Sequence, residues 1–167
     1  TADKVYCMAA ENGQVYVVDA VGDSMLAIVG VAPGCACLLA DEAGNVVYCA
    51  EALANSVSVI DCAGDSVRAT IPVGGYPYAQ ACDTVNNRLV VANRESHDLT
   101  VIDCASESVV GTVVLGDNYQ AVCAGGDDRV YCAGKQTGLV TVVDAATNRV
   151  VANIPAAGEA ADLCWYP

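Results

Sequence analysis

Four aspartates recur at a nearly fixed interval and are the first candidates for chemistry. Asp19, Asp61, Asp103 and Asp144 each end an apolar run, in the phrases VYVVD, VSVID, LTVID and VTVVD, at intervals of 42, 42 and 41 residues. A row of carboxylates could bind a metal ion or transfer protons. The regularity favours a structural role, because Asp side chains accept hydrogen bonds from nearby backbone N–H groups in tight turns. We therefore predict that these aspartates cap turns.

Ten cysteines form the second chemical group. In the repeat, Cys7, Cys49 and Cys132 share a position with Val91, and Cys62 and Cys104 share one with Ala20 and Ala145; a third position is predicted to hold Cys82, Cys123 and Cys164. A cysteine that alternates with Val or Ala behaves as a small buried hydrophobic residue. We expect free thiols rather than a disulfide framework. The single Cys35-x-Cys37 pair lacks a second pair at zinc-site spacing, and we expect no metal and no other cofactor.

The elements that position these residues are short strands. In the repeat covering residues 78–115, apolar runs at 78–83, 88–93, 99–103 and 109–115 are separated by polar turns, which predicts four antiparallel strands. A period of 40–45 residues built from such strands is typical of a β-propeller blade. The sequence therefore predicts a single all-β domain over residues 1–167. Its repeats cover about 1–36, 37–78, 79–119 and 120–160, and residues 161–167 complete the first blade.

How the ring closes is left open between alternatives. The strand expected at residues 161–166 could pair with the first strand, at residues 4–8, and so remove the open edge of the sheet. A self-closed ring of four blades is the favoured prediction. The alternatives are a ring of eight blades made by two chains and a filament joined through terminal strands.

One stretch resembles a known repeat family. The segment NSVSVIDCAGDSVRATIPVGGYPYAQACDTVNNRLVVANRES, residues 55–96, is similar to the YVTN β-propeller repeat, and the likeness extends over the whole chain with a departure at residues 30–44. The resemblance implies a β-propeller, location outside the cell or on its surface, and no enzymatic activity. It implies no shared catalytic motif.

Charge and composition exclude some partners. The net charge is −13, from 20 acidic and 7 basic residues. Such a surface repels nucleic acid and anionic lipid, and no apolar run approaches the roughly 18–20 residues of a membrane span. We expect neither a nucleic-acid partner nor insertion into a membrane.

Candidate binding residues are those that break the repeat on the face where loops surround the channel, since ligand sites favour such concave surfaces. Tyr residues there could stack on a sugar or peptide, or could pack between blades. His97 is the only histidine and has no nucleophile at a recognisable spacing, so a catalytic triad is not expected. The predicted binding set is Tyr76, Tyr78, Arg94, His97, Asp117, Asn118, Tyr119 and Glu159, and Lys135 also breaks the repeat.

Three functions are compatible with these residues. The leading hypothesis is a non-enzymatic interaction module that binds a protein or a glycan through the loop face. The second is a structural subunit of a surface layer, sheath or filament. The third is a propeller hydrolase or lactonase, which would need Asp117, Asn118, Glu159 and His97 to gather around a metal.

Overall fold

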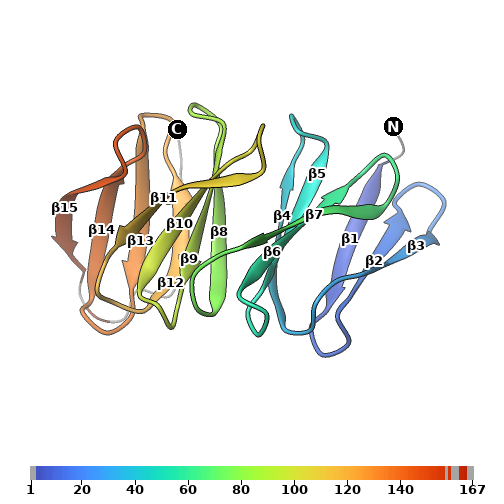
Figure 1. Cartoon of the computed structure of the whole chain (residues 1–167), viewed down its shortest axis with the longest axis horizontal. Coiled ribbons are helices and arrows are strands. Elements are labelled where there is room, and N and C mark those ends of the chain that lie inside the picture. The colour runs from blue at the N-terminus through green and yellow to red at the C-terminus, as the bar shows by residue number, and fades with distance from the viewer. Residues whose placement is uncertain (1–2, 157, 159–161, 165–167) are drawn as a thin grey trace.

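The computed structural model describes residues 3–156, 158 and 162–164, and in this part of the chain all regular structure is antiparallel β. Fifteen described strands form four sheets, each made of strands that are consecutive in the chain (Figure 1). None of the described residues belongs to a helix that could cross a membrane.

The first sheet has three strands and the other three sheets have four. The first contains β1 (Lys4–Ala9), β2 (Gln14–Asp19) and β3 (Ser24–Gly30). The second contains β4 (Cys35–Asp41), β5 (Val46–Glu51), β6 (Ser56–Asp61) and β7 (Ser66–Pro72). The third contains β8 (Pro77–Asp83), β9 (Arg88–Asn93), β10 (Asp98–Asp103) and β11 (Ser108–Val114). The fourth contains β12 (Tyr119–Ala124), β13 (Arg129–Gly134), β14 (Leu139–Asp144) and β15 (Arg149–Pro155).

The recurrent aspartates are turn caps, as predicted. Asp19, Asp61, Asp103 and Asp144 each accept a hydrogen bond from a backbone N–H two or three residues later, at 3.0, 2.8, 2.8 and 2.8 Å respectively. Hydrogen bonds from the Ser106 backbone and side chain lower the pKa of Asp103. These carboxylates therefore hold the turn that leads into the last strand of each sheet, which is β3, β7, β11 or β15.

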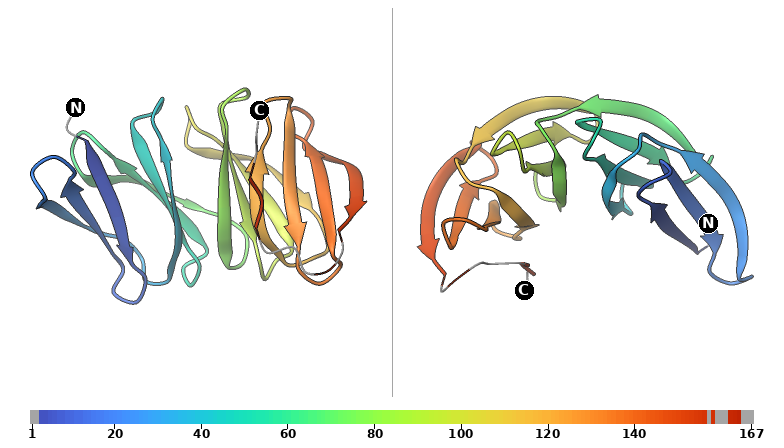
Figure 2. Two further views of the ribbon diagram at one scale, coloured as in Figure 1. Left: turned by 180° about the vertical axis from the view of Figure 1, so that it is seen from behind. Right: turned by 90° about the horizontal axis from the view of Figure 1, so that it is seen from below.

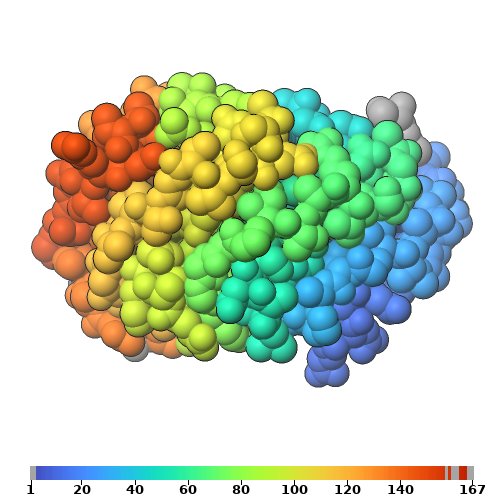
Figure 3. All heavy atoms as spheres, viewed as in Figure 1, coloured from blue at the N-terminus to red at the C-terminus, as the bar shows by residue number. Residues whose placement is uncertain are grey.

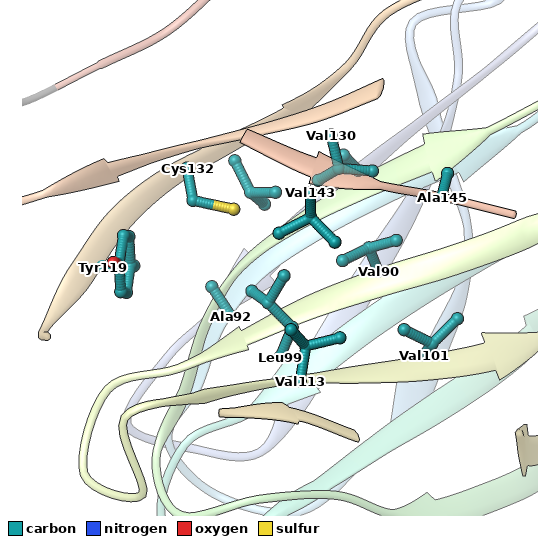
Figure 4. Close-up of a cluster of buried hydrophobic side chains, with 12 residues drawn as sticks. Val90, Ala92, Leu99, Val101, Val113, Tyr119, Val130, Cys132, Val143 and Ala145 are labelled. Carbon is teal, nitrogen blue, oxygen red and sulfur yellow. The ribbon is translucent and has the colours of Figure 1, made fainter. Parts of the chain in front are cut away.

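The sheets stack on one another in chain order. We call the face that a sheet turns toward the next sheet its forward face, and the opposite face its rear face. Between the third and fourth sheets, a core forms from Val90, Leu99 and Val101 on one side and Val130 and Val143 on the other, all 3% exposed or less (Figure 4). Strands such as β5 are buried on both faces, which explains their nearly continuous apolar sequence.

The four sheets form an open arc, not a closed ring (Figure 2). Within the described residues β1 pairs only with β2, and residues 162–164 form no strand. Closure by a strand at 161–166 is therefore not seen, although residues 161, 165 and 166 lie outside the described residues. The convex side of the arc carries the outer strands, among them β7 and β11, as a continuous surface (Figure 3).

The ten cysteines are free thiols, and Cys35, Cys49 and Cys132 are buried. One part of the predicted alignment is wrong. Cys82 pairs with Leu89, whereas Cys123 pairs with Tyr131, which is one position out of step. Four residues separate the strands in both hairpins, but β12 has six residues where β8 has seven, and this shifts the alignment.

Each connection between sheets is anchored by one buried polar side chain at the loop face. Glu51 accepts hydrogen bonds from the Ala32 N–H (2.9 Å) and the Ser58 hydroxyl (2.6 Å). Asn93, which is 0% exposed, acts through Thr100: it donates to Thr100 Oγ1 at 2.8 Å, and the Gly74 N–H of the connection donates to the same oxygen at 3.2 Å. The equivalent residue of the fourth sheet is a glycine, Gly134.

Asp117 supplies the anchor of the fourth sheet from the connection that precedes it. A side chain on Gly134 would place its Cβ only 2.3 Å from Asp117 Oδ2, so Asp117 fills the space that a side chain at position 134 would need. Its carboxylate accepts hydrogen bonds from the backbone N–H groups of Asn118, Gln136 and Thr137, at 2.6, 3.2 and 3.0 Å, and from the Thr137 hydroxyl. Burial on its own raises the pKa of Asp117, but these hydrogen bonds outweigh it and the pKa is lowered.

We expect Asp117→Asn to destabilise the protein at neutral pH by roughly 1–3 kcal/mol, because buried donors lose their charged acceptor. Because folding lowers the pKa of Asp117, its carboxylate stabilises the folded state at pH values above the ordinary Asp pKa of about 4. This stabilisation is lost as the pH falls through the folded-state pKa. Urea unfolding at pH 7 and near pH 3 checks this: the deficit of the variant should shrink at the lower pH. The exposed Asp127→Asn is the control, and an equal deficit at both values would contradict the role of the charge.

Candidate functional site: the loop-face cleft

A cleft lies on the loop face where the third sheet meets the fourth. It consists of two adjoining hollows of about 460 Å³ each, which share Arg94 and Asn118. One hollow is lined in addition by Tyr76, Glu95 and His97. The other is lined in addition by Lys135, Gln136, Thr137, Gly138, Ala156 and Gly158. We call the two hollows together the loop-face cleft.

Two residues of the cleft have a backbone conformation that L-amino acids disfavour. Tyr76 and His97 have φ angles of 57° and 56°. The positions equivalent to His97 include Gly13 and Gly138, and the position equivalent to Tyr76 in the preceding connection is Gly34, all with positive φ. Tyr at positive φ is an outlier, and His at positive φ is uncommon although it is more frequent there than most residues. Such strain persists where the surroundings enforce it and is concentrated at functional sites.

Backbone hydrogen bonds hold both strained residues in place. The Tyr76 N–H donates to Asn55 Oδ1 at 2.9 Å, and the Tyr76 carbonyl accepts from the Arg94 N–H at 2.8 Å. The His97 carbonyl accepts from the Leu115 N–H at 3.1 Å. The connection between β7 and β8 is thus joined to the turn between β9 and β10, and that turn is joined to the connection between β11 and β12.

The cleft concentrates positive charge in an acidic protein. Three of the seven basic residues form salt bridges elsewhere: Lys4 with Asp65, Arg68 with Glu107 and Arg129 with Asp144. Two cations, Arg94 and Lys135, line the cleft beside a single carboxylate, that of Glu95. The Arg94 guanidinium carbon lies 5.4 Å from the centroid of the Tyr78 ring, which is within the range of a cation–π contact. The cleft is therefore suited to an anionic group.

Asn118 adds an unused polar atom. Its Oδ1 is buried and has no hydrogen-bond partner, while its carbonyl accepts from the Lys135 N–H at 2.9 Å. A buried acceptor without a partner is costly, so a ligand that donates a hydrogen bond here would remove that cost.

The structure gathers part of the predicted binding set. Tyr76, Arg94, His97 and Asn118 line the cleft, and Tyr78, which is 37% exposed, lies beside Arg94. Lys135 joins them, whereas the contributions of Gln136 and Thr137 were not predicted from the sequence.

Two predicted residues lie elsewhere, and a third falls outside the described residues. Tyr119 is 2% exposed, belongs to the core between the third and fourth sheets, and shares a hydrogen bond of 2.8 Å with Thr141 Oγ1. It therefore takes the packing role that the sequence left as an alternative to stacking. Asp117 is the buried anchor of a connection and does not face a ligand. Glu159 lies outside the described residues.

No set of three or more His, Cys, Asp or Glu side chains within the described residues is arranged to hold a metal ion.

No protein-family model and no curated protein matches the chain. Solved structures do match. The chain superposes on Kuenenia stuttgartiensis hydrazine synthase with a TM-score of 0.83 and 22% identity, over 90% of this chain and 45% of that one. For the dihydro-heme d1 dehydrogenase NirN in complex with DHE, the TM-score is 0.77 and the identity 17%, over 92% and 35% of the two chains.

A third match is Saccharomyces cerevisiae Sqt1, with a TM-score of 0.75 and 13% identity, over 88% of this chain and 44% of that one. This chain spans less than half the length of each of the three solved chains. At these identities the matches show the fold alone, and they place the four sheets among β-propeller-like structures.

Replacing His97 with Gly tests the strain in the cleft. A non-glycine residue in the left-handed region costs about 1–2 kcal/mol, and the greater freedom of Gly in the unfolded chain offsets roughly 0.5–1 kcal/mol of that cost. We expect His97→Gly to raise the free energy of unfolding by up to about 1 kcal/mol, measured by urea unfolding. Asn45→Gly, at a φ of 52° in an exposed turn, is the matched control and should change little, since Asn tolerates this region. A His97→Gly variant less stable than the parent would contradict the strain.

Proposed function

We propose that the chain is a non-enzymatic binding module, secreted or displayed at the cell surface, that holds a carboxylate-bearing segment of a protein or glycan in the loop-face cleft. The observation that carries the proposal is the joint placement of Tyr76 and His97 at positive φ in one cleft. The equivalent positions of the other sheets carry Gly or Asn, so larger side chains occupy these turn positions only here within the described residues.

The chemistry of the cleft supports the ligand class. Arg94 and Lys135 can donate charge-assisted hydrogen bonds to a carboxylate, and such bonds are about twice as strong as neutral ones. Asn118 Oδ1 can accept from a hydroxyl or amide N–H of the same ligand. Tyr76 offers an apolar ring with a polar tip to a sugar ring or peptide plane.

Titration calorimetry with an acidic oligosaccharide and with an acidic peptide, each beside its neutral counterpart, tests the proposal and separates the two sources of the carboxylate. We expect the double variant Arg94→Ala with Lys135→Ala to raise the Kd for the acidic ligand about tenfold or more, because a hydrogen bond to a charged group contributes roughly 1.5–3 kcal/mol. His97→Gly should also weaken binding while it stabilises the fold.

Arg149→Ala is the matched control, since Arg149 is an exposed cation on β15, outside the cleft. An equal loss of affinity in this variant would mean general attraction of anions and would refute the cleft as the site. Absence of binding by both the acidic oligosaccharide and the acidic peptide would refute the proposed ligand class.

A further inference from the structure

A cation crosses each of the three interfaces between sheets to the same turn of the following sheet. Lys4 on the first sheet donates to the Asp65 carboxylate and to the Cys62 carbonyl, each at 2.8 Å. Arg88 on the third sheet donates to the Ala145 carbonyl and lies 3.5 Å from Asn148 Oδ1.

At the middle interface Arg68 reaches Glu107. The residues reached, Asp65, Glu107 and Asn148, all have φ between 47° and 56° and so present their side chains from the same turn conformation.

The pattern is incomplete at the two ends of the arc. Strand pairing makes Arg129 the counterpart of Lys4, since Lys4 pairs with Asp19 and Arg129 with Asp144. Asp23 of the first sheet is the counterpart of Asp65 and has the same φ of 47°. Asp23 is exposed, and no described residue contacts it through a hydrogen bond or salt bridge. Arg129 pairs with Asp144 of its own sheet at 3.1 Å. From the same position Lys4 reaches the following sheet, so Arg129 can also reach an Asp23 that the same arc does not bring to it.

The rear face of the first sheet also matches a packing surface, and no described residue of the chain covers it. By pairing register, Val5, Cys7 and Val18 are the counterparts of Val130, Cys132 and Val143, residue type for residue type, and Ala20 is the counterpart of Ala145.

In the fourth sheet these residues pack against the third sheet and are at most 4% exposed. In the first sheet Val5 is 52% exposed and Cys7 is exposed too. The same residues in the same register predict that the rear face of the first sheet packs as the rear face of the fourth does, against the forward face of another sheet.

The fourth sheet offers that forward face. Ala133 and Val142 in its middle are already buried, whereas Ile154 on its outer strand is 50% exposed. Burial raises the pKa of Cys123 on the innermost strand, and the nearby Cys164 and Asp162 add to the effect. Residues 162–164 therefore lie beside β12. They occupy the place on the fourth sheet that β12 occupies on the third, where it contacts β8 and β9.

Within the described residues, the first sheet has no inner strand. The edge of β1 opposite β2 is unpaired within the described residues. A groove of about 820 Å³ lies between β1 and the second sheet, lined among others by Lys4, Tyr6, Asp41 and Val47. The segment at 162–164 of a neighbouring arc would arrive at this edge, where the other sheets carry their inner strand.

We infer that the forward face of the fourth sheet docks on the rear face of the first sheet of a second copy of this chain, with Arg129 of one copy paired to Asp23 of the other. The first and last sheets turn toward the same side of the arc (Figure 2), so one second copy can meet both ends. Two such contacts close a ring of eight sheets with two-fold symmetry, which ends head-to-tail growth. This inference does not depend on the ligand proposed for the loop-face cleft.

Solution mass of the 167-residue chain tests the inference first. Sedimentation equilibrium should give twice the chain mass of 17.0 kDa. A species of 17.0 kDa that does not associate with rising concentration would overturn the docking, and species that grow without limit would overturn the closed pair.

Charge reversal tests the ion pair within the interface. Asp23→Lys and Arg129→Glu should each raise the dissociation constant of the pair at least about tenfold, since like charges placed opposite one another cost several kcal/mol. A chain that carries both substitutions should recover the affinity of the parent, because both contacts then hold an inverted pair. Failure of the double variant to recover would overturn the assignment of Arg129 to Asp23. Glu11→Lys, an exposed reversal in the turn between β1 and β2, is the charge control.

The apolar part of the interface has its own matched variants. Val5→Asp should give a folded single chain, whereas Val85→Asp, at a residue 56% exposed in the turn between β8 and β9, should leave the pair intact. Circular dichroism verifies that both variants are folded. Alkylation of Cys7 supplies a second readout: it should be slow in the parent and fast in Val5→Asp. Fast alkylation in a parent of double mass would place the contact elsewhere and overturn the inference.

Discussion

The structure depends on one repeated contact, the packing of the forward face of each sheet on the rear face of the next. The chain contains no Phe and one Trp. Apart from Tyr48 and Tyr119, the buried residues of this contact are Val, Leu, Ile, Ala and Cys, whose small and branched side chains allow two twisted sheets to approach closely. Burial of such side chains contributes in proportion to the apolar area removed from water. Each hairpin forms between strands that are neighbours in the chain, whereas the packing of one sheet face on the next determines how the sheets are arranged.

Because the faces hold the sheets together, the loop face is free to carry unfavourable conformations. The buried anchors Glu51, Asn93 and Asp117 fix each connection from below with hydrogen bonds. Tyr76 and His97 can then adopt left-handed backbone angles above them without loosening the core. The apolar faces thus supply the stability, the polar anchors position the loops, and the exposed ends of the loops form the cleft that we propose as the binding site.

Much of this was predictable from the sequence. The strands of the third sheet begin and end within one residue of their predicted bounds, because a polar turn follows every apolar run. The burial of Tyr119 had a signal in the repeat, since its counterparts Cys35 and Pro77 are buried as well. The sequence also carried a signal that the fourth sheet takes its anchor from another position. Gly134 has no side chain and stands where the two preceding sheets carry Glu51 and Asn93, so the anchor had to come from elsewhere, and Asp117 supplies it.

Other features could not be predicted from the sequence. The opening of the arc depends on the angle between successive sheets, which follows from the summed volumes of the side chains between them rather than from any one residue. The left-handed φ of Tyr76 arises from tertiary contacts, since the Asn55 side chain that holds its N–H is 21 residues away.

The open arc has a consequence for how the protein comes apart. Nearly all strand pairing joins neighbours in the chain, so the molecule behaves as a linear stack in which each sheet is stabilised by the one or two sheets it touches. The second and third sheets are covered on both faces, whereas the first is covered on one and has only three strands. Backbone amides of β1–β3 in an isolated chain should consequently exchange with solvent through local openings of low free energy. Amides in β5 and β9 should exchange only when the stack is lost, so that opening proceeds inward from the end of the arc.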